Sequence, residues 1–464
     1  MKNKNWYPIL TWGLIVFFTV LYISLIFNNN IVTDEAFTMQ LLGGNFREII
    51  AGTANDVHPP LYYIIGKIFQ IVFGNSLQVQ KIAAIIPTVF TLLLGPWKVR
   101  KHFGWKTAFF FVLSIACIPC SMQFALQVRM YSLALFCVTA CGLFAYECFN
   151  LEEKNIWSWI GLVLSALGAA YAHYFALVAV IAINGLFLIA ILCKKRSLWK
   201  NWLAASAAMI LGYLPWFGIL LWQVGNVTTS YWIPPITKDV CWGYFTWTFG
   251  LEQFPWTTYV FLLLLIFAGI TSLVAIWKRK EQESVYAQLC MLVPTAVCVI
   301  GVGFSLLTRP VYREQYVFPA IGLLCLFFAI AVRNYPEKIL IPIAAFLLFV
   351  GAFQYKENFR EEYRSTYVPQ MEAFFEENLQ ADDCIIYNFE VLGFIYKYYF
   401  PENDCIYMGD WNPDNEYHRT YFLDTASELK FTDGQLAEWG YTRTLAGHFG
   451  IEQNEFDIYV LEKQ

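Results

Sequence analysis

Long apolar runs separated by short polar segments fill the first three quarters of the chain. Their length matches the roughly 20 residues that a helix needs to cross a bilayer. They predict about eleven membrane-spanning helices, at 8–27, 79–97, 107–122, 130–149, 156–172, 174–193, 202–222, 256–277, 285–307, 311–332 and 339–354. A twelfth apolar stretch, 59–73, is shorter and carries Lys67 and Gln70. Hydropathy alone does not decide whether it spans the membrane.

Basic clusters decide how the twelfth stretch is used, because Lys and Arg gather in cytoplasmic loops. The clusters lie at 2–4, 98–106, 194–200, 278–280 and 333–338. They all fall on one side only if 59–73 does not span, and Pro59-Pro60 suits the start of a helix. We therefore expect 59–73 to lie along the membrane surface. The N-terminus is then cytoplasmic, and the outer face carries 28–78, Arg129, His173, 223–255, Arg309 and the C-terminal region.

After about residue 355 the pattern changes to short alternating helix-like and strand-like runs. Helix-like runs at 371–379 and 391–398 alternate with strand-like runs at 384–387 and 405–408. This alternation is typical of a small α/β layer with partly parallel strands. The sequence thus predicts a transmembrane domain over 1–355 and an extracytoplasmic acidic α/β soluble domain over 356–464.

Composition separates the same two regions. The chain is 58% hydrophobic and 14% charged, whereas a soluble domain carries about 25% charged residues. Residues 356–464 contain 22 of the 35 acids but only 8 of the 31 bases, so their net charge of −14 contrasts with +10 in the rest. We expect a multi-pass α-helical protein of the plasma membrane, with membrane lipid around it and no nucleic-acid partner.

Acidic residues are scarce in 1–355, yet four of the 13 fall in one short interval after the first apolar run: Asp34, Glu35, Glu48 and Asp56. Carboxylates at a membrane boundary are costly to desolvate, so a group of them there predicts a functional site. The alternative is that they are loop residues wetted at the interface. Two adjacent carboxylates in a partly desolvated pocket repel each other, so we expect a raised pKa for at least one of them.

These acids belong to a series of polar motifs that lie in the first outer loop and at the predicted outer ends of later spans. The motifs are Thr33-Asp34-Glu35-Ala36, Asp56-Val57-His58-Pro59-Pro60-Leu61, Gln127-Val128-Arg129-Met130-Tyr131-Ser132-Leu133, Tyr171-Ala172-His173-Tyr174-Phe175 and Arg313-Glu314-Gln315-Tyr316 with Pro319. Their order and sidedness resemble the GT-C fold glycosyltransferases that use polyprenyl-phosphate sugars. Within that fold, the pattern resembles the protein O-mannosyltransferase family and the bacterial lipid A aminoarabinose transferase family. The likeness covers most of 1–355, but the chain lacks the central insert of the eukaryotic mannosyltransferases.

The resemblance implies a GT-C membrane domain with surface-lying helices in the first outer loop. It also implies transfer of a sugar from a polyprenyl-phosphate donor, such as undecaprenyl phosphate, to a glycan, lipid or protein acceptor of the cell envelope. The carboxylate after the first span is catalytic in that family, which assigns Asp34 as the base, with Glu35 placing the acceptor. The expected reaction is direct displacement with inversion, which needs a base beside the attacking hydroxyl.

The leaving phosphate needs fixed positive charge or a metal. Arg129, beside Tyr131, is the main candidate, because a guanidinium grips phosphate with two donors. Its alternative role is an interfacial arginine that snorkels to the membrane surface. Arg313 and Arg309 are weaker candidates of the same kind.

Asp56 and His58 are suited to hold a divalent metal ion as a cofactor, or to orient Asp34. The alternative role of His58 is to cap the helix that starts at Pro59-Pro60. Three further residues, His173, Trp232 and Tyr63, are assigned to substrate binding. Trp232 lies in an aromatic loop that covers the donor site in the family. Alternatively, His173 is an ordinary histidine at the membrane interface, and the loop of Trp232 belongs to an aromatic belt there.

Three other functions remain open. A lipid or oligosaccharide transporter or flippase would place charges at the midplane on broken helices in repeated halves. Here the charges sit at span ends on one side and the halves do not match, which favours the enzyme. An oligosaccharide ligase that uses lipid-pyrophosphate donors is compatible with the same residues. A membrane scaffold would leave the acidic group unexplained.

Overall fold

The computed structural model describes residues 6–150, 155–227, 233, 235–364, 367–425, 429–451 and 454–463. It divides into two compact units. The first comprises Met1–Ile26 with Phe46–Asn358, and the second comprises Phe27–Asn45 with Phe359–Gln464. The second unit therefore combines the segment after the first helix with the C-terminal region, a grouping of which the hydrophobic pattern gives no sign.

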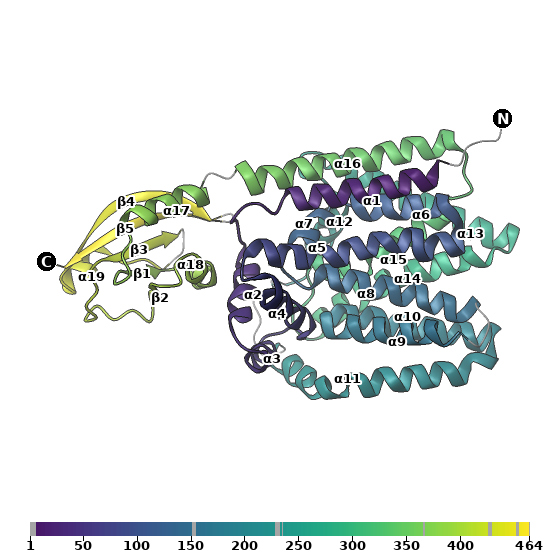
Figure 1. Cartoon of the computed structure of the whole chain (residues 1–464), viewed down its shortest axis with the longest axis horizontal. Coiled ribbons are helices and arrows are strands. Elements are labelled where there is room, and N and C mark those ends of the chain that lie inside the picture. Colours follow the sequence, from purple (N-terminus) through teal and green to yellow (C-terminus); the bar gives the residue numbers. More distant parts are fainter. Residues whose placement is uncertain are drawn as a thin grey trace. The chain divides into compact units, whose positions relative to one another are not determined.

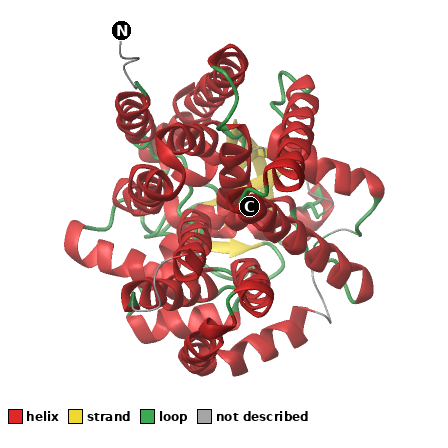
Figure 2. Cartoon of the chain, turned by 90° about the vertical axis from the view of Figure 1, so that its right-hand side faces the viewer, coloured by secondary structure: helices red, strands yellow, loops and turns green. Residues whose placement is uncertain are grey.

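The first unit is a bundle of helices, seen along its length in Figure 1 and from its end in Figure 2. The helices are α1 (Tyr7–Ser24), α3 (Phe46–Asn55), α4 (Leu61–Phe73), α5 (Leu77–Leu94), α6 (Arg100–Cys117), α7 (Ser121–Leu126), α8 (Tyr131–Asn150), α9 (Ile156–Ala172), α10 (Tyr174–Lys194), α11 (Trp199–Val227), α12 (Lys238–Phe249), α13 (Trp256–Val274), α14 (Gln282–Leu307), α15 (Phe318–Val332) and α16 (Glu337–Arg364). Short π-helical turns at Gly95–Val99 and Ala275–Arg279 extend α5 and α13.

Nine helical segments of the described residues are long and apolar enough to cross a membrane. One of them, Leu77–Cys117, contains Gly104 at φ 84°, where the backbone leaves the helical conformation. Glycine adopts this conformation without steric cost. The break lies inside α6, and it divides the segment into one arm before Gly104 and one after it, as expected from the separate apolar runs at 79–97 and 107–122. The remaining expected span, α9, is apolar but has 17 residues. The prediction of a multi-pass helical membrane protein is confirmed.

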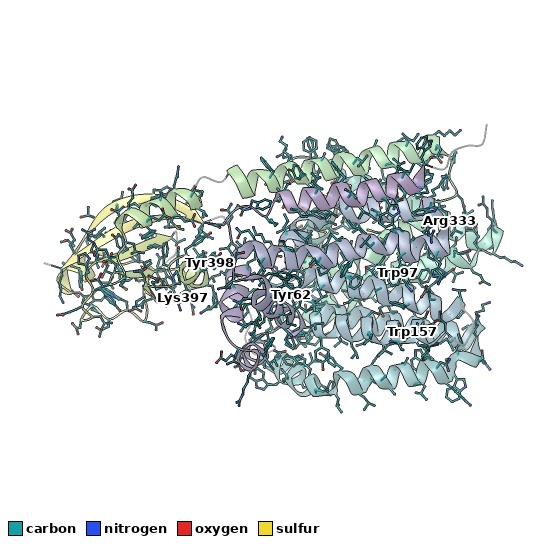
Figure 3. All side chains as sticks on the ribbon, viewed as in Figure 1. Tyr62, Trp97, Trp157, Arg333, Lys397 and Tyr398 are labelled. Carbon is teal, nitrogen blue, oxygen red and sulfur yellow. The ribbon has the colours of Figure 1, made fainter. Side chains whose placement is uncertain are left out.

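Helices α3 and α4 lie together at one end of the bundle (Figure 1). Helix α4 follows Pro60 and has 13 residues, fewer than a span requires. The side-chain amide of Gln80 in α5 donates a hydrogen bond to the Gly66 carbonyl in α4. Figure 3 places Tyr62 at this end of the bundle and Trp97, Trp157 and Arg333 toward the other.

A buried ionic cluster ties helices together at the end that carries the basic residues. Glu147 of α8 is 1% exposed and accepts hydrogen bonds from Lys98, Lys101, His102 and Ser158, at 2.5, 3.2, 2.9 and 3.1 Å. A carboxylate buried in an apolar bundle is tolerated only when it is paired and hydrogen-bonded. The cluster therefore fixes α8 against α6 and α9.

The second unit contains a five-stranded sheet with strand order β2-β1-β3-β5-β4. The strands are β1 (Cys384–Tyr387), β2 (Asp404–Tyr407), β3 (Thr420–Thr425), β4 (Tyr441–Ile451) and β5 (Asn454–Lys463). Strand β1 pairs in parallel with β2 and β3, whereas β5 runs antiparallel to β3 and β4. All four residues of β1 are buried, as expected for the centre of a parallel sheet. The predicted small α/β domain with partly parallel strands is confirmed.

Four helices complete the second unit: α2 (Thr33–Gly43), α17 (Tyr367–Asn378), α18 (Gly393–Tyr399) and α19 (Asp433–Glu438). Helix α2 packs on α18, where the rings of Phe37 and Phe394 meet edge to face at 5.4 Å. The Tyr399 hydroxyl donates a hydrogen bond of 2.8 Å to the Asn29 carbonyl. These contacts hold the segment that carries Asp34 and Glu35 against the C-terminal region.

Candidate active site

Four polar side chains meet at the end of the bundle that holds α3 and α4. The His58 ring contacts Asp56 Oδ2 through Nδ1 at 2.6 Å and Arg129 Nη2 through Nε2 at 3.4 Å. Arg129 Nη1 donates a hydrogen bond of 3.1 Å to the Tyr63 hydroxyl. A neutral imidazole satisfies both neighbours when Nδ1 carries the proton, because Nε2 then accepts from the guanidinium. The geometry thus favours one tautomer of His58, held by Asp56.

The charges of this cluster are largely removed from water. Arg129 is 3% exposed, and the side chains of His58 and Asp56 are 12% and 27% exposed. Burial alone would raise the pKa of Asp56, but the hydrogen bond with His58 and then the positive charge of Arg129 bring it below its ordinary value. Asp56 is therefore ionised at neutral pH and compensates part of the buried Arg129 charge.

His173 lies beside this cluster as the N-cap of α10. Its Nδ1 accepts the Phe175 backbone N–H at 3.1 Å, and its ring lies 6.4 Å from that of His58, 5.5 Å from Tyr131 and 5.3 Å from Tyr316. Burial, followed by the positive charge of Arg129, lowers the pKa of His173 well below its ordinary value. His173 is thus a neutral imidazole with its proton on Nε2.

Gln223 of α11 holds the loop that carries Asp56 in place. It is 2% exposed, and the two N–H groups of its Nε2 are shared among the backbone carbonyls of Thr53, Ala54 and Asp56, at 2.9, 3.1 and 2.6 Å. Its Oε1 accepts from the Tyr174 hydroxyl, which itself accepts from Trp216 Nε1 at 3.0 Å. Sequence reasoning missed this role. The available signal was a lone amide near the end of a long apolar run.

A cavity of about 280 Å³ adjoins these groups. Its polar lining comes from His58, His173, Tyr174, Gln223 and Tyr316, and its apolar lining from α10, α11 and α14. A small space with a few convergent polar groups is the usual form of a ligand site. The described structure therefore combines buried charge, a neutral histidine and an adjacent cavity at one place.

Arg313 and Tyr131 also belong to the first unit. Arg313 Nη2 donates to Glu314 Oε1 at 2.6 Å. Burial works against its charge, but the Glu314 carboxylate, with the Tyr316 and Tyr131 hydroxyls, raises the pKa of Arg313 overall. Tyr131 is 3% exposed, whereas Arg309 is exposed. The structure thus brings Arg129, Tyr131, Tyr63, His58, Asp56 and His173 together, with Arg313 near Tyr131.

Asp34 and Glu35 belong to the second unit, in the first turn of α2. Glu35 Oε2 accepts the backbone N–H of Val32 at 3.1 Å, so it caps its own helix. Burial and then the nearby Glu35 and Glu372 carboxylates raise the pKa of the Tyr398 hydroxyl to about 12. The carboxylate of Asp34 is exposed. The roles assigned to these two acids stay predictions.

Asp56 and His58 fit a metal ion poorly. Both ring nitrogens of His58 are engaged, and one of them faces the Arg129 guanidinium, whose charge would repel a divalent cation. Of the described residues, only Asp382, Asp383 and His418 form a group of three with metal-ligating atoms within 4.8 Å of one another. Asp383 there already accepts the Gln380 N–H and contacts His418. The predicted Trp232 lies outside the described residues.

Comparison with known proteins places the fold. No family model and no curated protein matches the chain. Its structure is similar to that of ArnT from Cupriavidus metallidurans bound to undecaprenyl phosphate, with a TM-score of 0.64, 13% identity and 98% of both chains covered. The chain has the ArnT fold. ArnT in the apo state gives a TM-score of 0.63 at 12% identity, covering 97% of this chain and 98% of ArnT.

The predicted architecture, a helical membrane domain followed by a small C-terminal α/β domain, therefore agrees with the ArnT fold. An oligosaccharyltransferase from Archaeoglobus fulgidus, in complex with zinc and sulfate, aligns at a TM-score of 0.46 and 12% identity, over 96% of this chain and 74% of its own. At these identities the likeness to ArnT establishes the fold, and the activity has to be argued from the residues of this chain.

Proposed function

We propose that this chain is a membrane glycosyltransferase that transfers a sugar from a polyprenyl-phosphate donor to a cell-envelope acceptor. The observation that carries the proposal is Arg129, a buried guanidinium oriented by the Tyr63 hydroxyl and His58. Such a group is suited to an anionic phosphate. The ArnT fold supports the proposal further, because the similar ArnT structure is bound to undecaprenyl phosphate.

The cluster accounts for the leaving-group half of the reaction. Arg129 binds the donor phosphate with two N–H donors, and Tyr131 and Arg313 complete the phosphate site. Asp56 keeps His58 in the tautomer that accepts from Arg129, which fixes the guanidinium before the donor arrives. Neutral His173 donates its Nε2–H to the donor, with Tyr63 and Trp232 as further contacts. As both nitrogens of His58 are engaged, no step is assigned to a metal.

Asp34 supplies the acceptor half of the reaction. Its carboxylate takes the proton of the acceptor hydroxyl while that oxygen forms a bond to the anomeric carbon. The bond between this carbon and the phosphate oxygen breaks, and its electron pair leaves with the polyprenyl phosphate. Attack from the face opposite the phosphate inverts the configuration. Glu35 places the acceptor in addition to capping α2.

The charge pattern supports an outer location for this chemistry. The basic clusters lie at the opposite ends of the spans from Arg129 and His173, and basic residues favour the cytoplasmic side. The proposal therefore has a cytoplasmic N-terminus and an extracytoplasmic C-terminal region. The acceptor is a glycan, lipid or protein outside the membrane.

Binding of undecaprenyl phosphate tests the phosphate site directly. The purified chain is titrated with this lipid in nanodiscs, as wild type, Arg129→Gln and the matched control Arg309→Gln, which changes an exposed arginine. Hydrogen bonds to charged groups contribute about 1.5–3 kcal/mol, so Arg129→Gln should weaken binding by at least about tenfold. Arg309→Gln should bind like the wild type. Equal binding by all three proteins would remove Arg129 from the site.

A panel of donors separates the proposed reaction from an oligosaccharide ligase. Lipid monophosphates carrying one sugar are compared with lipid pyrophosphates carrying an oligosaccharide, in membranes that contain the wild type. The proposal expects turnover with a monosaccharide donor. Turnover with the pyrophosphate donors alone would identify a ligase instead.

A further inference from the structure

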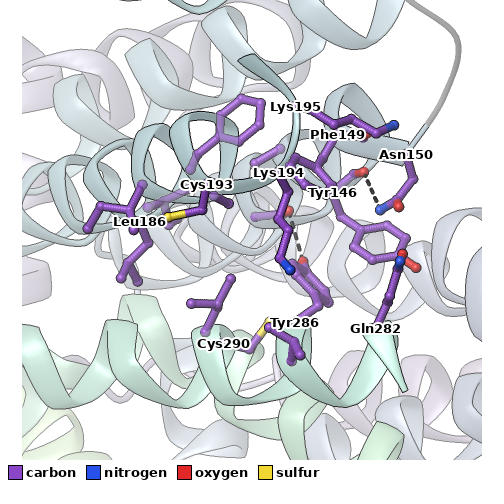
Figure 4. A pocket seen from close by; sticks show the side chains of 18 of the residues that line it. Tyr146, Phe149, Asn150, Leu186, Cys193, Lys194, Lys195, Gln282, Tyr286 and Cys290 are labelled. Carbon is purple, nitrogen blue, oxygen red and sulfur yellow. Dashed lines mark hydrogen bonds between the residues drawn. The ribbon is translucent and has the colours of Figure 1, made fainter. Parts of the chain in front are cut away.

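A second, larger cavity lies between α8, α10 and α14 in the first unit (Figure 4). Its volume of about 740 Å³ falls within the roughly 300–1,000 Å³ of ligand pockets in general. The lining runs from Gly142 to Asn150 on α8, from Ile183 to Lys195 at the end of α10, and from Gln282 to Val293 on α14.

The same three helices lead from this cavity to the candidate active site. Helix α10 begins at the N-cap His173 and reaches the large cavity with its last residues, whereas α14 begins at the large cavity and reaches the small one with Ile300 and Phe304. Helix α8, which starts at Tyr131, has 20 residues and so is about 30 Å long. The large cavity is therefore near the opposite membrane face.

The lining of this cavity is apolar in its interior and basic at the end where α10 finishes. Ile183, Phe187 and Leu323 contribute to its apolar wall, and Lys194, Lys195 and Lys280 contribute three amines. Figure 4 shows Lys194 reaching toward Tyr286, while Lys195 turns away. Lysine side chains commonly lay their methylene groups along apolar surface and leave the amine at the polar boundary.

Several carboxylates at this end of the bundle are engaged with other cations. Glu147 contacts Lys98, Lys101 and His102. Glu281 and Glu283, on either side of Gln282 in the lining, each lie 3.6 Å from Arg333. Among the described residues, no ion pair joins a carboxylate to Lys194, Lys195 or Lys280. The end of the cavity therefore presents positive charge next to an apolar interior.

We propose that this cavity binds an anionic glycerophospholipid, with acyl chain in the apolar part and headgroup phosphate at Lys194 and Lys280. A basic pocket between membrane-spanning helices on the cytoplasmic side is the arrangement that selects anionic lipid headgroups. The apolar lining includes Ile189 and Val285, which are exposed on the surface of the bundle, and such a lining suits an acyl chain better than a soluble anion. The site is separate from the proposed glycosyl transfer and does not depend on it.

Lipid exchange into nanodiscs tests this site. The full chain is placed in phosphatidylcholine nanodiscs, and phosphatidylglycerol bound to the protein is titrated by native mass spectrometry. The variant Lys194→Gln with Lys280→Gln is compared with the control Lys200→Gln with Lys278→Gln, which removes the same charge from exposed residues outside the lining. The expected loss of affinity is about 30-fold for the first pair, the factor for two lysines near a lipid headgroup. The control pair should bind like the wild type.

A cavity-filling variant, Ala190→Trp, tests the acyl-chain part independently of charge, because Ala190 is in the lining. It should reduce the bound phosphatidylglycerol while Lys194 and Lys280 remain. Equal binding by the two lysine pairs, full retention of lipid in Ala190→Trp, or no preference for phosphatidylglycerol over phosphatidylcholine would each overturn the proposal. Preferential binding of undecaprenyl phosphate in this cavity would also overturn it, since the site would then belong to the donor.

Discussion

The interaction of Asp56 with His58 makes the stability of the folded chain depend on pH. Burial alone would raise its pKa, but His58 and Arg129 bring it below the ordinary value of 3.8. A carboxyl whose pKa is lowered by folding stabilises the folded chain above its unfolded-state pKa, and this contribution is lost as the pH falls through the folded-state pKa. Asp56→Asn should therefore lower Tm at pH 7 by an amount that stays constant to about pH 4 and shrinks in stronger acid.

Thermal unfolding of the two proteins in detergent between pH 3 and pH 7 measures this difference. The exposed Asp239→Asn serves as the control and should follow the wild type throughout. A gap in Tm between wild type and Asp56→Asn that is as large at pH 3 as at pH 7 would show that the ionised carboxylate is not the stabilising form.

Gln223 should act by positioning the loop that carries Asp56. Gln223→Leu leaves three backbone carbonyls without their amide donor, and each unsatisfied buried group costs about 1–3 kcal/mol when it finds no substitute. We expect lower Tm and weaker binding of undecaprenyl phosphate. Gln288→Leu is the control, because that amide reaches one carbonyl at 3.4 Å. Unchanged lipid binding by a stable Gln223→Leu protein would exclude a positioning role.

Individual residues were predictable where their chemistry was unusual for their surroundings. Asp56, His58 and Arg129 are polar groups beside apolar runs, and the structure brings His58 within hydrogen-bond distance of both Asp56 and Arg129. The partners of Gln223 were not predictable. Its contacts depend on how α11 packs against the loop after α3, and a one-dimensional pattern does not contain that packing.

Glu147 should be the main structural link between α6, α8 and α9. Glu147→Ala would leave Lys98, which is 7% exposed, buried without its carboxylate. Removing one partner of a buried ion pair costs about 3–5 kcal/mol, so we expect a large fall in Tm in detergent. Glu283→Ala, which removes a 3.6 Å contact with Arg333 at a more exposed site, should change Tm far less. Similar Tm values for both variants would contradict the assignment.

Most helices were predictable because the period and length of an apolar run determine whether it can span. The break at Gly104 agrees with the separate spans expected on either side of it. In the C-terminal region, the apolar runs at 384–387 and 405–408 became the parallel strands β1 and β2. Strand β4 was missed, because the residues of Tyr441–Ile451 do not alternate cleanly between buried and exposed.

At the scale of the whole molecule, the grouping of α2 with the C-terminal region was not predictable. It rests on contacts such as Phe37 with Phe394, which join residues more than 300 positions apart. Hydropathy assigns α2 to the loop after the first span and gives no information on its packing partner. The general GT-C architecture was nevertheless predictable, because the order of the polar motifs follows the order of the spans.

The proposed transfer is tested most directly by release of undecaprenyl phosphate from a radiolabelled sugar donor. Membranes hold wild type, Asp34→Asn or the exposed control Asp410→Asn at equal abundance. A general base contributes about 10²–10⁴-fold to the rate, so Asp34→Asn should be at least about 100-fold slower than the other two in forming a glycosylated product. Equal rates for Asp34→Asn and wild type would contradict Asp34 as the base, and no turnover by the wild type with any sugar donor would contradict the proposed function.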